Sequence, residues 1–169
     1  MEFPKSIISH RIETLSSRKL AGMKVRMCLS GDQTFKLWSS FMPVRKNIPF
    51  TVGSELYSVR IYDPLYFTGY FPDREFEKWA AAEVEGFACI PPEFKTMTIP
   101  GGLYAIFRYR GSSADAGETF RFIYTDWLHN SGYILDDRPH FDILGNKYKN
   151  GDPASEEDIC IPVKLKIPN

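Results

Sequence analysis

The two halves of the chain repeat one order of elements, and this repeat restricts the fold more than any other feature of the sequence. Each half has an alternating strand-like run, then a helical run that begins with a Thr-Phe pair, then further strand-like runs. The predicted strands are 23–29, 57–61, 103–109, 139–144 and 157–165, and the predicted helices are 33–42 and 118–128. Strands that outnumber helices in this order predict an α+β fold, with an antiparallel sheet and helices packed on one face.

The second helix has the clearest pattern in the chain. Its apolar residues follow the i, i+3, i+4, i+7, i+8 spacing of one helical face, and they are Phe120, Ile123, Tyr124, Trp127 and Leu128. Asp115 and Glu118 have the spacing of a capping box at its start. In the first helix, Phe35, Trp38 and Met42 have helical spacing.

Three other segments bear on the organisation of the chain. Pro100-Gly101-Gly102 is a turn sequence between two strand-like runs and predicts a hairpin. The segment 75–84 (EFEKWAAAEV) is compatible with either a helix or a strand. We expect residues 1–10 to form an arm and residues 11–169 to form a single domain, with halves at about 11–90 and 91–169.

Charge and hydropathy argue against several classes of protein. The 21 basic and 21 acidic side chains give a net charge of +0, which is unlike the basic surface of a nucleic-acid-binding protein. No helix-turn-helix pattern is visible. No apolar run reaches the roughly 18 residues of a membrane span, and the start of the chain lacks the apolar core of a secretory signal. Three widely spaced cysteines (Cys28, Cys89 and Cys160) fit the reducing cytoplasm, where we expect the protein.

Motifs for bound cofactors and metals are absent from the sequence. It has no phosphate-binding loop, no dinucleotide-binding turn and no G-x-S-x-G elbow. The three histidines and three cysteines have no zinc-ligand spacing. We therefore expect no metal and no cofactor.

Aromatic residues make up 15% of the chain, an unusually large share. They fit either an aromatic-rich core or a ligand pocket lined by flat rings. Composition alone leaves both interpretations open.

Three motifs in the second half resemble those of the GyrI-like small-molecule-binding domain, which is also the effector-binding module of certain multidrug-responsive transcription activators. They are IPGGLYAIFRYRG, ETFRFIYTDWLHNSGYILDDRPHFDIL and EDICIPVK, and they extend from Phe94 to Lys164. The resemblance implies two β-α-β-β halves related by a pseudo-two-fold, with a ligand cleft between them. It also implies binding of hydrophobic, often cationic aromatic molecules by aromatic walls and one internal glutamate.

The internal acid of the family falls on Asp158 in this sequence, four residues before Pro162. Asp158 has a shorter side chain than glutamate, and the preceding Glu157 should point to the opposite face of its strand. The alternative for Asp158 is a residue that caps a turn or faces solvent. The other candidate ligand-binding residues are Trp127, Tyr104, Phe107, Phe141, Trp38, Tyr57 and Glu157, each with a core role as the alternative.

We expect a stand-alone binding domain for small hydrophobic molecules, cationic aromatic ones included, that acts in sensing or sequestration. The resemblance leaves two alternatives open, a hydrolase of strained electrophilic toxins and a protein-interaction module that inhibits DNA gyrase. The expected partner is a small molecule, with no direct binding of nucleic acid or membrane. A protein partner, either a separate regulator or gyrase, stays open.

Overall fold

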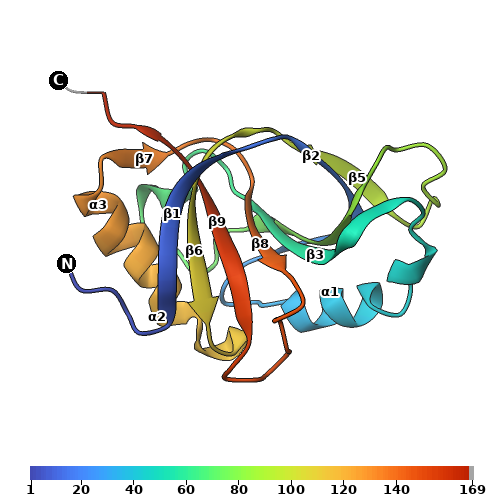
Figure 1. Cartoon of the computed structure of the whole chain (residues 1–169), viewed down its shortest axis with the longest axis horizontal. Helices are drawn as coiled ribbons and strands as arrows, with labels where there is room; N and C mark the ends of the chain where they lie inside the picture. The colour runs from blue at the N-terminus through green and yellow to red at the C-terminus, as the bar shows by residue number, and fades with distance from the viewer. Residues whose placement is uncertain (168–169) are drawn as a thin grey trace.

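A computed structural model describes residues 1–167, in which nine strands form one antiparallel sheet (Figure 1). The strands are β1 (Ile7–Leu15), β2 (Arg18–Met27), β3 (Thr51–Ile61), β4 (Phe76–Val84), β5 (Lys95–Ile99), β6 (Gly102–Arg110), β7 (Tyr133–Leu135), β8 (His140–Leu144) and β9 (Glu156–Leu165). The helices are α1 (Thr34–Phe41), α2 (Gly117–Phe122) and α3 (Leu128–Asn130), and a π-helical turn at Ile123–Trp127 joins α2 to α3. Short 3₁₀ turns lie at Arg45–Asn47, Tyr66–Thr68 and Ser113–Asp115.

The strand order shows the two expected halves. It runs β1-β6-β9-β8-β3-β4-β2-β5, with β7 paired to β9, so that β6-β9-β8 on one side mirrors β2-β4-β3 on the other. The halves join where β3 pairs with β8, and Val59 lies opposite Phe141 in that pairing. This arrangement confirms the α+β fold and the repeated β-α-β-β plan.

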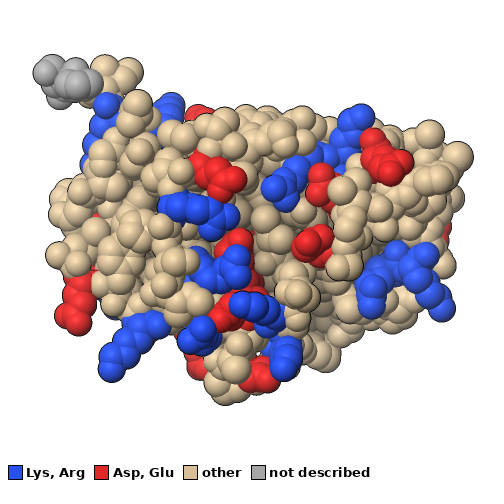
Figure 2. Space-filling view, in the orientation of Figure 1, with Lys and Arg blue, Asp and Glu red and all other residues tan. Residues whose placement is uncertain are grey.

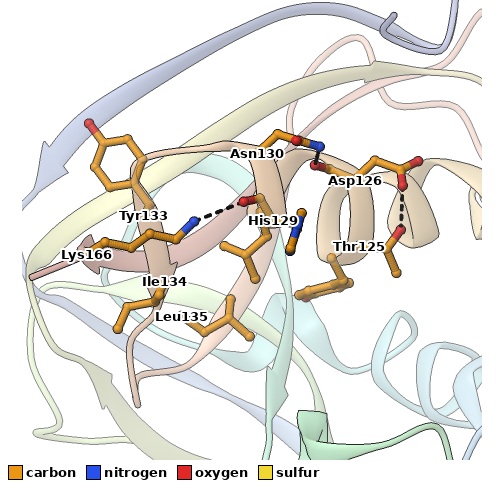
Figure 3. A pocket seen from close by; sticks show the side chains of 10 residues that line it. Thr125, Asp126, His129, Asn130, Tyr133, Ile134, Leu135 and Lys166 are labelled. Carbon is orange, nitrogen blue, oxygen red and sulfur yellow. Dashed lines mark hydrogen bonds between the residues drawn. The ribbon is translucent and has the colours of Figure 1, made fainter. Parts of the chain in front are cut away.

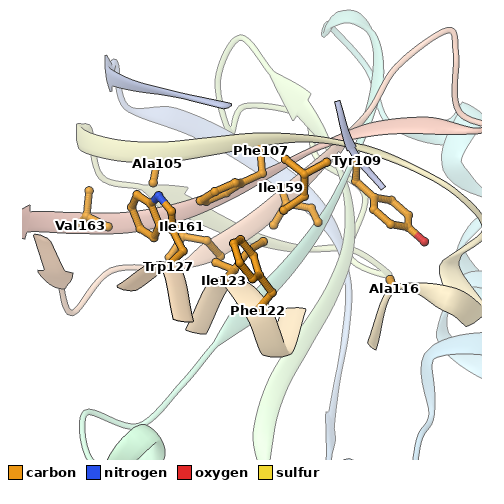
Figure 4. Packing of buried hydrophobic residues seen from close by; sticks show 11 residues of the cluster. Ala105, Phe107, Tyr109, Ala116, Phe122, Ile123, Trp127, Ile159, Ile161 and Val163 are labelled. Carbon is orange, nitrogen blue, oxygen red and sulfur yellow. The ribbon is translucent and has the colours of Figure 1, made fainter. Parts of the chain in front are cut away.

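The continuous helical segment 117–130 packs its predicted apolar face on β6 and β9 (Figure 4). Trp127 is 4% exposed, and its ring meets that of Phe107 edge-on with 5.0 Å between centroids. Ile159 and Ile161 on β9 complete this core, which confirms the helical stripe. Asp115 does not cap the helix. Its carboxylate accepts a hydrogen bond from the hydroxyl of Ser112, 2.6 Å away, so the capping box was wrong.

Helix α1 covers the other half of the same face, but it buries a different stripe from the one predicted. Leu37 and Phe41 are buried against β4, whereas Phe35 is 84% exposed and Met42 is 40% exposed. Trp38 is half-buried and packs edge-on against Phe41. A helix this short buries only about two residues per face, so the spacing of the aromatic residues did not identify the face.

The segment for which the sequence allowed either a helix or a strand forms a strand, β4, at residues 76–84. β4 lies between β2 and β3 and is buried on both faces, where its run of alanines leaves room for α1. Gly22 on β2 lies opposite Ala81, and a side chain there would meet the backbone of β4.

Two further expectations need correction. The turn at 100–101 does not close a hairpin, because β5 pairs with β2 whereas β6 pairs with β1 and β9. Strand β1 begins at Ile7, inside the segment expected to be an arm, and Ile7 lies opposite Tyr109. Among residues 1–167, no helix is long and apolar enough to span a membrane.

Acidic and basic side chains are interspersed on the face of the molecule shown in Figure 2. Neither sign of charge forms a continuous region there.

Candidate functional site

Charged side chains gather on the helix-bearing face of the four central strands, between the two helices. The sheet register brings them together, since Arg60 on β3 lies opposite His140 on β8 and opposite Lys78 on β4. Asp142 on β8 lies opposite Ile159 on β9. Glu157 is two residues before Ile159 and therefore points to the same face of the sheet as Asp142. We call these five residues (Arg60, Lys78, His140, Asp142 and Glu157) the charged cluster.

Arg60 and Asp142 form the strongest contact in the charged cluster. The guanidinium donates two hydrogen bonds to the carboxylate, at 2.7 and 3.0 Å, and the residues are only 5% and 6% exposed. The Arg60 guanidinium also lies 5.0 Å from the ring centroid of Phe120. Its Nε has no hydrogen-bond partner within residues 1–167. A buried bidentate pair of this kind fixes both side chains and holds β3 against β8.

Glu157, like Lys78, has no direct side-chain partner within the charged cluster. It is 8% exposed, and its carboxyl group forms no ion pair and no side-chain hydrogen bond with the described residues. Burial, with a further contribution from Asp142, raises the pKa of Glu157 to about 8, although Arg60 and Lys78 act in the opposite direction. Glu157 is therefore mostly protonated at neutral pH.

Three other titratable groups have pKa values that are shifted by the same burial. The pKa of Lys78 is lowered to about 8 by burial and by the positive charge of Arg60. Burial also holds the pKa of His140 well below its usual range, so the imidazole is neutral at pH 7. The Tyr124 hydroxyl lies 2.7 Å from His140 Nδ1, and burial raises the pKa of Tyr124, so the phenol keeps its proton.

Aromatic rings cover the charged cluster. Phe67 stacks on Tyr124 with 4.8 Å between ring centroids, and on His140 with 5.6 Å. Tyr62 packs edge-on against both Phe67 and His140, at 4.9 Å in each case. We call residues 62–68 the aromatic lid.

Arg74 holds the aromatic lid in place, since its Nη1 donates to the carbonyl oxygens of Leu65 and Tyr66, each 2.8 Å away.

A groove of about 700 Å³ lies next to the charged cluster and has Tyr124 as one of its walls. Figure 3 shows residues of the helix facing residues of β7 across it, with Lys166 reaching the helix end. The Lys166 ammonium donates to the carbonyl oxygens of His129 and Ser131, at 3.0 and 2.7 Å. Tyr124 is thus shared by the groove and the ring stack with Phe67.

The structure divides the candidate site residues between the two faces of the sheet. Tyr57, Tyr104 and Phe141 lie together on the face away from the helices. The ring centroid of Phe141 is 6.1 Å from that of Tyr57 and 5.2 Å from that of Tyr104. Trp127 of the second helical segment packs on Phe107 in the core of the face that bears the helices, and Trp38 belongs to α1. Only Glu157 joins the charged cluster.

Asp158 lies on the opposite face from Glu157, as the alternation of strand residues predicts. Arg108 Nε and Nη2 donate to its two oxygens, at 2.5 and 3.1 Å, and an Arg11 nitrogen lies 3.9 Å away. Asp158 thus already has a guanidinium partner within the protein.

The sequence reasoning missed Arg60, Lys78, His140, Asp142 and the aromatic lid. A polar residue in an apolar strand was the available signal, as in the HFDIL run, where Asp142 interrupts the apolar residues. Arg60 and Asp142 are 82 positions apart, so the strand register was needed to pair them.

Comparisons with known proteins identify the family to which the fold belongs. Residues 9–164 match the GyrI-like small molecule binding domain. The transcriptional regulator BrlR of Pseudomonas aeruginosa is 24% identical over 155 residues, which cover 90% of this chain and 54% of BrlR. The chain thus spans about half the length of this curated relative.

Solved structures share the fold at low identity. SAV2435 bound to tetraphenylphosphonium has a TM-score of 0.66 and 16% identity, and the match covers 93% of this chain and 94% of that one. The C-terminal domain of EcmrR has a TM-score of 0.68 and 12% identity, over 94% and 98% of the two chains. A hydrolase from Listeria innocua has a TM-score of 0.61 and 11% identity, over 95% and 94%. The family match over residues 9–164, together with the paired β-α-β-β halves, shows that this chain belongs to the GyrI-like family of small-molecule-binding domains.

Proposed function

We propose that the chain binds hydrophobic aromatic cations between its two helices, with Glu157 as the anionic partner and the aromatic lid as the wall. The observation that carries this proposal is Glu157 itself. It is a buried carboxyl group without an ion-pair partner among residues 1–167.

A cationic ligand would relieve the cost of ionising Glu157 in this position. Direct charge pairing favours the carboxylate, and each ring facing the cation adds about 0.5–2 kcal/mol of attraction. Phe67 lies over both Tyr124 and His140, whose own ring centroids are 5.7 Å apart, so its place on that pair has the shape of a flat ring. We infer that a ligand ring enters from the neighbouring groove and replaces Phe67 there.

Glu157 suits this role better than Asp158. Asp158 is neutralised by Arg108, and a ligand would have to break that pair. Trp127, Phe107 and Trp38 support the helices that flank the site.

The comparisons give this proposal its ligand class and its biological setting. SAV2435 has been solved with tetraphenylphosphonium, which is a hydrophobic cation, and BrlR is a transcriptional regulator. We propose the same ligand class here, serving either sensing or sequestration. The three free thiols fit a role in the cytoplasm.

A binding titration with tetraphenylphosphonium tests the proposal. Calorimetry at pH 8 should show saturable binding that Glu157→Gln weakens at least about tenfold, the effect of losing one charged contact. Asp158→Asn is the matched control on the other face of β9 and should bind as the wild type does. The neutral analogue triphenylphosphine oxide should bind more weakly than the cation.

Two results would contradict the proposal. One is that wild type and Glu157→Gln bind tetraphenylphosphonium equally well, and the other is that only Asp158→Asn weakens the binding. Mass spectrometry of the recovered ligand adds a second readout. Conversion of ligand in excess of the protein would indicate the hydrolase alternative.

A further inference from the structure

Strand β1 lies at one end of the sheet, and no strand within residues 1–167 pairs with its outer edge. It is nine residues long, contains neither proline nor lysine, and is regular after a bulge between Ile7 and Ser9. The strand at the other end, β5, has only five residues and begins with Lys95. Proteins protect edge strands from further pairing by shortening them or by adding lysine or proline. Of the two edges, β1 is therefore the one open to another strand.

The hydrogen bonds of the neighbouring strand show which backbone groups of β1 face outward. Gly111, directly after β6, donates its N–H to the carbonyl oxygen of Ser155 on the side of β9, at 2.9 Å. Arg110 donates its N–H to the carbonyl oxygen of Ser6 on the side of β1, at 2.7 Å. Alternate residues of an antiparallel strand bond to opposite neighbours, so the even-numbered residues of β6 bond to β1.

The same alternation leaves every second residue of β1 with unused backbone groups. The residues opposite even-numbered positions of β6 bond to that strand, and they include Ser9, Arg11 and Glu13. The residues that follow each of these turn their N–H and C=O groups outward, and they are His10, Ile12 and Thr14. His10 and Thr14 are exposed, so a second strand can reach this edge.

Opposite charges lie two residues apart on the face of β1 away from the helices. The side chains of Arg11 and Glu13 are 48% and 46% exposed, and Arg11 Nε donates to Glu13 Oε2 at 2.7 Å. Ile12, between them, points to the helix-bearing face and packs against its core. An antiparallel strand of the same sequence meets these two charges in reverse order. A second copy of β1 is therefore complementary in charge to the first.

Three registers place Ile12 opposite an outward residue of a second copy. With Ile12 opposite His10, the two Arg11 side chains face each other, and with Ile12 opposite Thr14, the two Glu13 side chains do. With Ile12 opposite Ile12, Arg11 of each copy lies opposite Glu13 of the other, and His10 lies opposite Thr14. Opposite charges stabilise a cross-strand pair and like charges destabilise it, so the register centred on Ile12 is favoured.

We propose that two copies of this chain associate through β1, antiparallel about a two-fold axis at Ile12, into one continuous sheet. Each pair of outward residues exchanges two backbone hydrogen bonds. Two Arg11–Glu13 pairs lie across the joint on one face, and the two Ile12 side chains meet on the other. The helices of both copies lie on the same face of the joined sheet, and the association needs no ligand.

Sedimentation equilibrium over roughly 5–500 µM protein should show monomer and dimer, because an interface of one strand per copy is small and binds weakly. Arg11→Glu and Glu13→Arg should each weaken dimerisation about tenfold or more, because each places like charges opposite one another. Arg26→Glu and Glu75→Arg are the matched controls, since they reverse the same charges in an exposed ion pair elsewhere. A protein that stays monomeric throughout overturns the proposal, and so do equal effects of the two sets of variants.

An equimolar mixture of Arg11→Glu and Glu13→Arg tests the register. In the mixed dimer each acidic side chain lies opposite a basic one, so mixing should restore the dimer that neither variant forms well alone. Failure of two folded variants to associate would contradict the register.

Thr14→Pro provides a test that does not depend on charge. It removes an N–H group that β6 does not use, so the monomer should keep its circular dichroism spectrum. The dimer should be lost, because the proline blocks the outer edge of β1. A dimer that survives this substitution would overturn the proposal.

Discussion

Replacement of Glu157 by glutamine should stabilise the protein at alkaline pH. The pKa of Glu157 rises from its ordinary value of 4.5 to about 8 in the folded protein. An acid with a raised pKa holds its proton more tightly in the folded state, so stability falls as the pH rises from about 4.5 through 8. Glutamine has the shape of the protonated glutamate side chain but does not ionise, so the variant does not lose stability from the ionisation of this side chain as the pH rises.

The magnitude follows from the difference between the two pKa values. At about 1.36 kcal/mol per pKa unit, the change from 4.5 to about 8 corresponds to roughly 5 kcal/mol when Glu157 is fully ionised. Arg60 and Lys78 partly offset this cost, and Asp142 adds to it; His140 stays neutral. All four remain in the variant, so the difference between the proteins reports Glu157 together with its interactions with these neighbours.

Urea unfolding of both proteins at several pH values measures this effect. The free-energy difference in favour of Glu157→Gln should grow by up to about 1.4 kcal/mol per pH unit between pH 5 and 8, and then level off. Asp158→Asn, which removes the next carboxylate along β9 on the opposite face, serves as the control and should not reproduce this growth. A difference for Glu157→Gln that does not change with pH would refute the reasoning.

Three further predictions concern the fold and the lid. Phe67→Ala should strengthen tetraphenylphosphonium binding in calorimetry, because it empties the slot that the ligand ring needs; unchanged or weaker binding would contradict the lid. Asp142→Ala should cost about 3–5 kcal/mol in urea unfolding, because it leaves the buried Arg60 guanidinium unpaired, and a cost below about 1 kcal/mol would contradict that pairing. Gly22→Ala should cost about 1–3 kcal/mol by the same measurement, because the new carbon would lie 2.6 Å from the Ala81 Cα, and a neutral effect would show that β2 and β4 can separate.

The sequence predicted those parts of the fold that depend on local periodicity. The stripe from Phe120 to Leu128 and the alternation in β6 and β9 each appear in one continuous segment, so their spacing was sufficient. The order of these elements also predicted the two halves. The hairpin at Gly101-Gly102 failed because β5 and β6 find their partners in distant strands, which no local pattern specifies.

The candidate site was less predictable because its residues come from distant strands, and no local pattern specifies which strands pair. Alternation correctly separated Glu157 from Asp158, but it could not say which face of the sheet carries the helices. Arg108 lies 50 positions from Asp158 and already neutralises it. Of the aromatic residues, Phe107 and Trp127 form core, and Phe67 stacks on Tyr124 beside the charged cluster. That rings line a ligand pocket stays a prediction.

The most direct test of a ligand site between the helices is a crystal structure of the protein with tetraphenylphosphonium. We expect a phenyl ring of the ligand stacked on Tyr124 and His140 where Phe67 now lies, Phe67 displaced outward, and the phosphonium nearer to Glu157 than to any other carboxylate. A ligand bound on the other face of the sheet, with Phe67 still stacked on Tyr124, would contradict the account.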